Sequence, residues 1–211
     1  CRVSLESEQT NVSNLVLKTG NSQLKMNLRA ESGISDFGME TPIQLSIDGN
    51  IAGQDVLLFL PDSNDQITNW LSDKIFSLSG LVKGKVDQLN ITRFEIGATD
   101  GFSLKSEGSV SCVTDMEKMA GELNLAFVVD RGAYFAPLLS ENEEVGFVLP
   151  DHLSLTTDVT IANRTAKVDM KLKPGGGILH AVADFAWQEE TYRAEVHWKD
   201  FALNKFMPND S

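Results

Sequence analysis

Apolar and polar residues alternate along most of the chain with a period of two. Because successive side chains of a strand point to opposite faces of a sheet, each alternating segment has one apolar and one polar face. Such strands belong to antiparallel or meandering sheets, since parallel strands are buried on both faces. The pattern predicts a mostly β protein. The clearest segments are 24–30, 43–47, 122–129, 153–161, 168–172, 181–187 and 192–198.

Two segments break this alternation and predict helices. Ile67, Trp70, Leu71 and Ile75 recur at helical spacing after the capping residues 62–65, which predicts one helix near 62–78. The segment 133–140 (AYFAPLLS) predicts a short helical turn. Both lie between β segments, so we expect them to cover the apolar face or to close one of its ends.

A weak internal repeat suggests an elongated architecture. Segments 76–82, 102–110 and 153–159 each begin with an apolar residue, Ser and Leu, and later return to Val. We therefore expect one elongated β-repeat unit over 1–211, part of a larger chain, with sub-repeats near 1–60, 75–130 and 150–211. Chance similarity among alternating strands is the alternative. The step from Ile91 to Phe94 predicts a β-bulge.

Composition excludes several classes of function. The 211 residues carry 18 Lys and Arg against 30 Asp and Glu, a net charge of −12, which gives no basic surface for nucleic acid. Two cysteines exclude a disulfide-dense scaffold and a four-thiolate zinc site. No apolar run reaches the length of about 18 residues that a membrane span needs.

Catalytic and cofactor motifs are sparse. His180 and His197 fall on strands that could be neighbours, which leaves a two-histidine metal site open, but solvated histidines are the favoured interpretation. No nucleophile has a base at motif spacing, so we expect no enzyme, no cofactor and no metal. Cys1 and Cys112 could form a disulfide or stay as thiols. Cys1 is either an acylated lipoprotein cysteine or a fragment boundary, and we favour the fragment.

The second half of the chain resembles a known family. Segments 78–91, 101–110 and 121–127 repeat a strand, glycine, leucine rhythm, and the chain ends with 203–211 (LNKFMPNDS). Over residues 41–211 this resembles the periplasmic repeat region of TamB-like translocation and assembly proteins of the AsmA-like group, in particular their Bacteroidetes representatives. The final segment carries the resemblance most strongly.

The resemblance implies a fold and a function. It implies a long sheet folded lengthwise like a taco, whose apolar groove carries phospholipid acyl chains through the periplasm between the inner and outer membranes. It also implies a role in outer-membrane protein assembly with a barrel protein as partner. The inner-membrane anchor and C-terminal domain of the family would belong to other parts of the full-length chain, through which membranes are contacted.

Strand parity provides the candidate groove lining. An ordinary closed core is the competing interpretation of the same apolar positions. A secreted β-sandwich that binds carbohydrate or protein through its loops is the alternative function, and a scaffold that pairs an unfolded outer-membrane strand at a sheet edge is a third. The groove candidates are Leu123, Leu125, Phe127, Val168, Met170, Leu172, Phe185, Trp187, Val196 and Trp198.

Overall fold

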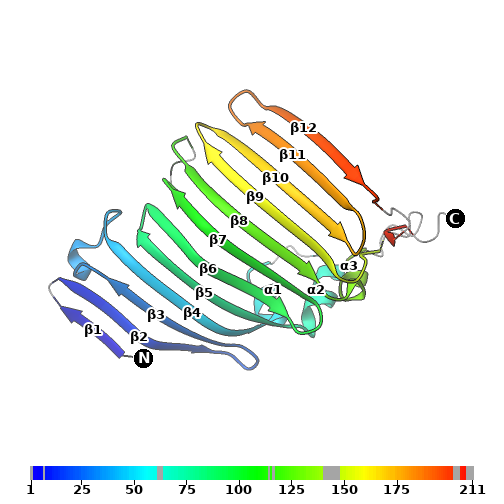
Figure 1. The fold of residues 1–211 in the computed structure, drawn as a ribbon. Coiled ribbons are helices and arrows are strands. Elements are labelled where there is room, and N and C mark those ends of the chain that lie inside the picture. Colours follow the sequence, from blue (N-terminus) through cyan, green and yellow to red (C-terminus); the bar gives the residue numbers. More distant parts are fainter. Residues whose placement is uncertain are drawn as a thin grey trace.

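Twelve antiparallel strands form one sheet in chain order, so each strand pairs with the next (Figure 1). The computed structural model describes residues 2–6, 8–60, 64–113, 115, 117–139, 148–201 and 205–207. The predicted mostly β, meandering fold is confirmed. The strands are β1 (Arg2–Glu6), β2 (Gln9–Lys18), β3 (Gln23–Ala30), β4 (Pro42–Ala52), β5 (Ile75–Lys85), β6 (Gln88–Ala98), β7 (Phe102–Ser111), β8 (Ala120–Val129), β9 (Leu153–Ala162), β10 (Thr165–Pro174), β11 (Ile178–Ala186) and β12 (Thr191–Lys199).

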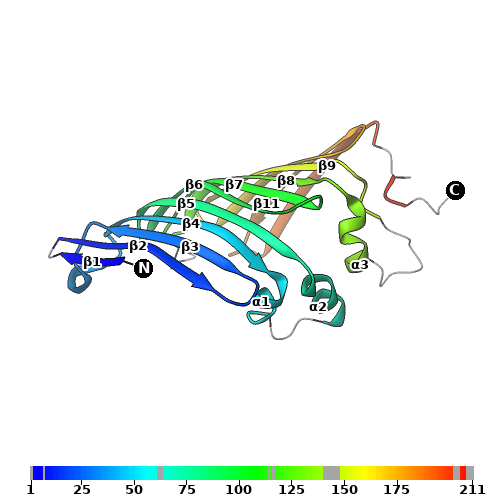
Figure 2. The ribbon, with the colours of Figure 1, turned by 90° about the horizontal axis from the view of Figure 1, so that it is seen from below.

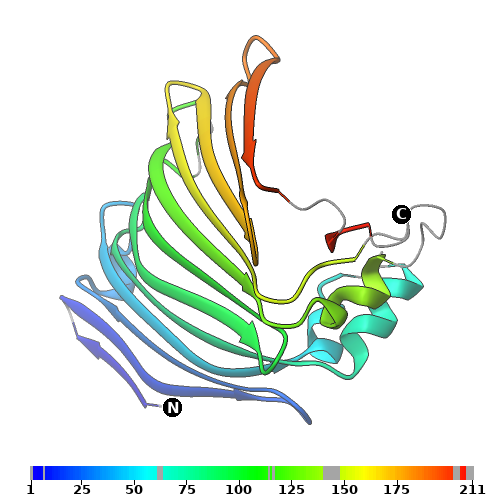
Figure 3. The same cartoon turned by 45° about the vertical axis from the view of Figure 1, so that its right-hand side comes forward.

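The sheet is curved, and its helices lie on the inner side of the curve at one end of the strands (Figures 2 and 3). Helices α1 (Gly53–Leu57) and α2 (Asp65–Ser72) connect β4 to β5. The turn η2 (Gly132–Phe135) and helix α3 (Ala136–Leu139) connect β8 to β9. In a meander, connections that follow even-numbered strands fall at the same end, which brings both insertions together. A separate turn, η1 (Ile34–Asp36), lies between β3 and β4.

The helices differ in extent from the sequence prediction. Helix α2 begins after Asn64, whose side-chain oxygen accepts a hydrogen bond of 2.9 Å from the backbone N–H of Ile67. It ends at Ser72, and residues 75–78 start β5 instead, where each of them pairs with a residue of β4. Helix α1 was not predicted. The predicted turn at 133–140 is present up to Leu139, while residues 61–63 and 140 lie outside the described residues.

The repeated segments start every second strand at the helical end of the sheet. They begin β5, β7 and β9 with Phe76, Phe102 and Leu153. Phe102 pairs with Val129, and Val129 pairs with Leu153, so these positions share one row across the sheet. The rings of Phe76 and Phe102 lie 6.1 Å apart. The repeat therefore places large apolar side chains where the helices cover the sheet.

The buried core is small and lies beside the helices. Val129, Leu153 and Phe206 form its buried cluster, with Phe201 stacked on Phe206 at 5.3 Å. The molecule exposes 13584 Å², whereas a compact monomer of 23.1 kDa exposes about 9,700 Å². This excess of about 40% is expected of one curved sheet whose faces do not close on a second sheet.

Candidate functional site

The strand register brings apolar residues of all twelve strands onto one face of the sheet, which we call the apolar face. Directly paired residues of antiparallel strands point to the same side. One row therefore crosses the whole sheet without a polar side chain, and it runs through Val3, Val12, Leu28, Leu45, Val82, Ile91, Gly108, Leu123, Val159, Val168, Ala183 and Ala194.

A second row lies beside the first, closer to the helices. It runs from Leu15 on β2 to Val196 on β12, and its polar members are Ser106 and Thr157. The bulge between Ile91 and Phe94 is observed as the sequence predicted, and it keeps both side chains on the apolar face. The apolar face is thus continuous in both directions of the sheet.

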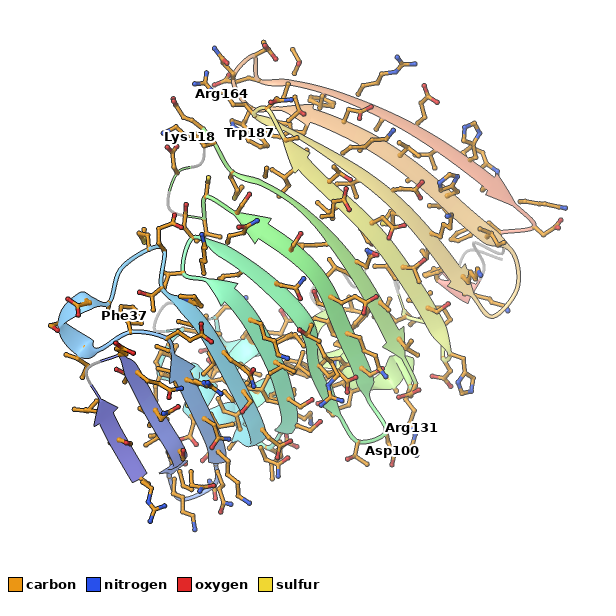
Figure 4. The ribbon with its side chains drawn as sticks, turned by 60° about the vertical axis from the view of Figure 1, so that its left-hand side comes forward. Phe37, Asp100, Lys118, Arg131, Arg164 and Trp187 are labelled. Carbon is orange, nitrogen blue, oxygen red and sulfur yellow. The ribbon has the colours of Figure 1, made fainter. Side chains whose placement is uncertain are left out.

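The opposite face, which we call the polar face, is hydrophilic in the same register (Figure 4). This contrast persists because each one-residue shift of register coincides with a β-bulge that returns the apolar side chains to the same face. Because the two faces differ so strongly, only one of them can meet apolar material. One complete polar row contains Ser4, Asn11, Arg29, Gln44, Lys83, Asn90, Ser109, Glu122, Thr160, Lys167, Asp184 and Arg193.

An aromatic cluster covers the apolar face at its helical end. Trp70 of α2 stacks on Phe135 at 5.8 Å and meets the edge of Tyr134 at 5.6 Å. Its indole N–H donates a hydrogen bond of 2.8 Å to the backbone oxygen of Tyr134. Phe135 in turn lies 5.6 Å from Phe102 and 6.1 Å from Phe127. The cluster consists of Trp70, Phe76, Phe102, Phe127, Tyr134 and Phe135 and joins both helical insertions to the sheet.

Tyr134 is a half-buried member of this cluster. Burial raises the pKa of its phenol, and the carboxylate of Asp73 contributes in the same direction. The phenol oxygen is buried and has no hydrogen-bond partner among the described residues. The sequence predicted a helix near 62–78 and a turn at 133–140, but not this cluster. Its local signal was Trp70 within an amphipathic helix, together with Tyr134-Phe135 in the short turn.

Away from the helices, the apolar face has no covering layer among the described residues. Large side chains at the β12 end of the face are exposed by 46% (Phe185), 84% (Tyr192), 47% (Val196) and 70% (Trp198). Monomeric proteins seldom leave a contiguous apolar patch larger than a few hundred Å² in water, and larger patches mark binding surfaces. The uncovered part of the apolar face is therefore the candidate functional site.

The structure places nine of the ten predicted lining residues on the apolar face by strand register. Phe127 lies under the helices, where it contacts Phe135. Trp187 follows the end of β11; its ring lies 6.4 Å from Phe185 and its backbone N–H donates to Arg164 O (Figure 4). The other eight residues on this face are Leu123, Leu125, Val168, Met170, Leu172, Phe185, Val196 and Trp198.

Two of the histidines lie beside one another on neighbouring strands. His180 and His197 are directly paired on β11 and β12, as the sequence suggested. His180 Nε2 lies 2.9 Å from Asp169 Oδ1 on the polar face. In the part of the chain that the structure describes, no three His, Cys, Asp or Glu side chains group as metal ligands.

Cys112 is the one cysteine among the residues that the structure describes. Cys112 is a free thiol of intermediate burial, and burial followed by the neighbouring Asp87 carboxylate raises its pKa. A raised pKa leaves less thiolate at neutral pH. Cys1, the other cysteine of the sequence, lies outside the described residues.

The polar face carries a shallow hollow of about 420 Å³. Its walls include Arg93, Glu95, Lys105 and Asp158, so both signs of charge are present. Lys105 Nζ lies 3.7 Å from Glu95 Oε1. This self-compensated surface gives no preference for a charged ligand, in contrast to the chemically uniform apolar face.

No family model, curated protein or solved structure matches this chain. Within the described residues, no helix has the length and apolar character needed to cross a membrane.

Proposed function

We propose that this chain is a lipid-shielding segment of a TamB-like, AsmA-like envelope protein, and that acyl chains lie against its apolar face in the periplasm. The observation that carries the proposal is the row from Val3 to Ala194, which crosses every described strand without a polar side chain. The described strands form no second sheet over this row. The resemblance in the sequence supports the same assignment.

Physical chemistry explains how such a face would hold a lipid. Each buried methylene contributes about 0.8 kcal/mol, so a 16-carbon tail with half its surface covered gains about 6 kcal/mol. These contacts are non-directional, so a tail can move along the face without crossing deep barriers. Twelve strands spaced about 4.8 Å apart extend the face over roughly 50 Å.

The single described sheet also argues against two competing interpretations, a closed core and a β-sandwich binding module. A closed core would need the apolar face to pack against another layer, and beyond the helical end the described residues supply none. The alternative of a secreted carbohydrate- or protein-binding module needs a β-sandwich of two sheets, whereas the described strands form one sheet. A barrel protein of the outer membrane stays a proposed partner for the full-length chain.

Lipid binding can be tested with matched substitutions on adjacent residues of β9. Val159 lies on the apolar face and Thr160 on the polar face, so Val159→Glu and Thr160→Glu add the same charge to opposite sides. After extraction without detergent, native mass spectrometry should show bound phospholipid on the parent chain and on Thr160→Glu. We expect Val159→Glu and Met170→Glu to lose it while their circular dichroism stays unchanged.

Two results would overturn the proposal. A parent chain that carries no lipid, and takes none up from vesicles, would exclude a shielding role. Equal loss of lipid from Val159→Glu and Thr160→Glu would place the bound molecule somewhere other than the apolar face. Phe127→Glu is a less specific variant, because Phe127 also contacts Phe135 in the aromatic cluster.

A further inference from the structure

Strand β12 forms an open edge of the sheet. All nine of its residues are exposed, and it contains no proline, glycine or register shift that would block a further strand. The described residues that follow it turn back toward the helical end. Phe206 packs with Val129 and Leu153, and Lys205 Nζ donates to the backbone oxygen of Gly175 at 3.0 Å. Among the residues that the structure describes, none covers the outer edge of β12 (Figure 1).

The charge pattern on β12 is complementary to itself. Arg193 and Glu195 lie on the polar face, with Arg193 Nη2 2.5 Å from Glu195 Oε1. If two copies of β12 pair antiparallel about Ala194, Arg193 of each copy comes opposite Glu195 of the other. The four charges then alternate in sign around the symmetry axis, which favours cross-strand pairing.

Other symmetric registers bring like charges together. Pairing about Arg193 or Glu195 places two identical charges on the axis, and pairing about Val196 places Arg193 opposite Lys199. Only the register about Ala194, among these four, combines opposite charges without a like-charge pair. This register also keeps the apolar residues of both copies on the same side of the sheet, because Tyr192 of one copy comes opposite Val196 of the other.

We propose that β12 is a docking edge for a second copy of this chain, paired antiparallel about Ala194. The two copies then form a twofold dimer with an isologous interface. Both apolar faces lie on the same side of the joined sheet, so the apolar face continues across the interface. Tyr192 and Val196, exposed by 84% and 47% in one copy, cover one another there. This inference does not require the lipid function.

Charge reversal tests the register. Analytical ultracentrifugation over a range of concentrations should show a reversible dimer of the parent chain. Arg193→Glu and Glu195→Arg each create like-charge pairs and should raise the dimer Kd by about tenfold or more. The double variant Arg193→Glu with Glu195→Arg restores opposite pairs and should return the Kd toward that of the parent. Lys167→Glu, on the polar face of β10, is the control and should leave the Kd unchanged.

Cross-linking tests the axis. In a background with Cys1→Ser and Cys112→Ser, Ala194→Cys should form a disulfide between copies under mild oxidation, because paired residues of antiparallel strands lie within disulfide reach. The same substitution at Val3, on the opposite edge, should not. A chain that stays monomeric at all concentrations would overturn the proposal. A dimer indifferent to both reversals, or cross-linked through Val3, would also overturn it.

Discussion

Trp70 and Phe135 stack at 5.8 Å with an interplanar angle of 25°, although one belongs to the β4–β5 connection and the other to the β8–β9 connection. This contact joins two separate insertions into one cap over the apolar face. The sheet has no opposing layer elsewhere among the described residues, so the cap supplies much of its tertiary burial.

We expect Trp70→Ala to destabilise the protein by about 3 kcal/mol, since truncation of a large aromatic side chain removes its packing area. Trp70→Phe keeps a ring but leaves the backbone oxygen of Tyr134 without its 2.8 Å hydrogen bond, and should cost about 1 kcal/mol. Urea unfolding measures both values.

A matched aromatic control is Phe59→Ala, since Phe59 is 80% exposed and should change the free energy of unfolding by no more than about 0.5 kcal/mol. If Trp70→Ala proved as mild as Phe59→Ala, the cap would not be a stabilising element.

Gly108 occupies the continuous apolar row at a position that other residues cannot adopt without strain. Its φ is +144°, and an added Cβ would lie 2.0 Å from the backbone oxygen of Glu122. Gly108→Ala should therefore cost at least about 2 kcal/mol in thermal or urea unfolding.

Gly20 provides the control for that substitution. A Cβ at Gly20 meets nothing within 4 Å, so Gly20→Ala should be neutral or stabilising by up to about 0.5 kcal/mol. A neutral Gly108→Ala would contradict the pairing of β7 with β8 that places Gly108 opposite Leu123.

Asp55 makes stability depend on pH in the acidic range. Its carboxylate accepts hydrogen bonds from the hydroxyls of Ser22 and Thr19, which lower its pKa from the ordinary value of 3.8. A lowered folded-state pKa means that the native state binds the proton less tightly than the unfolded state does. The resulting stability is fully present above about pH 5. It is lost as the pH falls through the folded-state pKa.

Asp55→Asn removes this contribution, so its stability should lie below that of the parent at neutral pH and converge toward it in acid. Urea unfolding from neutral pH down to about pH 3 measures the difference. Glu107→Gln, which removes one carboxylate from the polar face, serves as the control. A constant difference between Asp55→Asn and the parent at every pH would show that the Asp55 hydrogen bonds do not favour the ionised form.

The faces of the sheet could be predicted from the sequence because they depend on local alternation. Leu123, Val168 and Val196 were assigned to one face from parity alone, and the register places them there. Helix boundaries were harder, since Ile75 fits the helical spacing of Trp70 and Leu71, yet it begins β5 out of phase with Phe76 and is 59% exposed. Pairing with β4 decides the outcome, and that partner is distant in sequence.

The aromatic cluster was not predictable because it too depends on contacts between residues distant in sequence. Trp70 and Tyr134 are 64 residues apart, and only the order of the meander places their connections at the same end of the sheet. Trp187 shows that alternation alone does not predict where a strand ends. It continues the alternation of Phe185, yet β11 ends at Ala186, and the chain then turns into β12.

The bulge in β6 allows a test of whether the apolar face, and not the length of each strand, sets the strand register. Thr92 lies between Ile91 and Phe94 and is unpaired in the registers with β5 and β7. If Thr92 is deleted, Ile91 and Phe94 stay on the apolar face with Arg93 between them, so simple alternation is restored. We expect this deletion to fold with a loss of no more than about 1.5 kcal/mol. Deletion of Asn124 from β8 should instead move either Leu123 or Leu125 onto the polar face and abolish cooperative unfolding. Circular dichroism with urea titration compares the two deletions, and equal damage from both would show that the apolar face does not control the register.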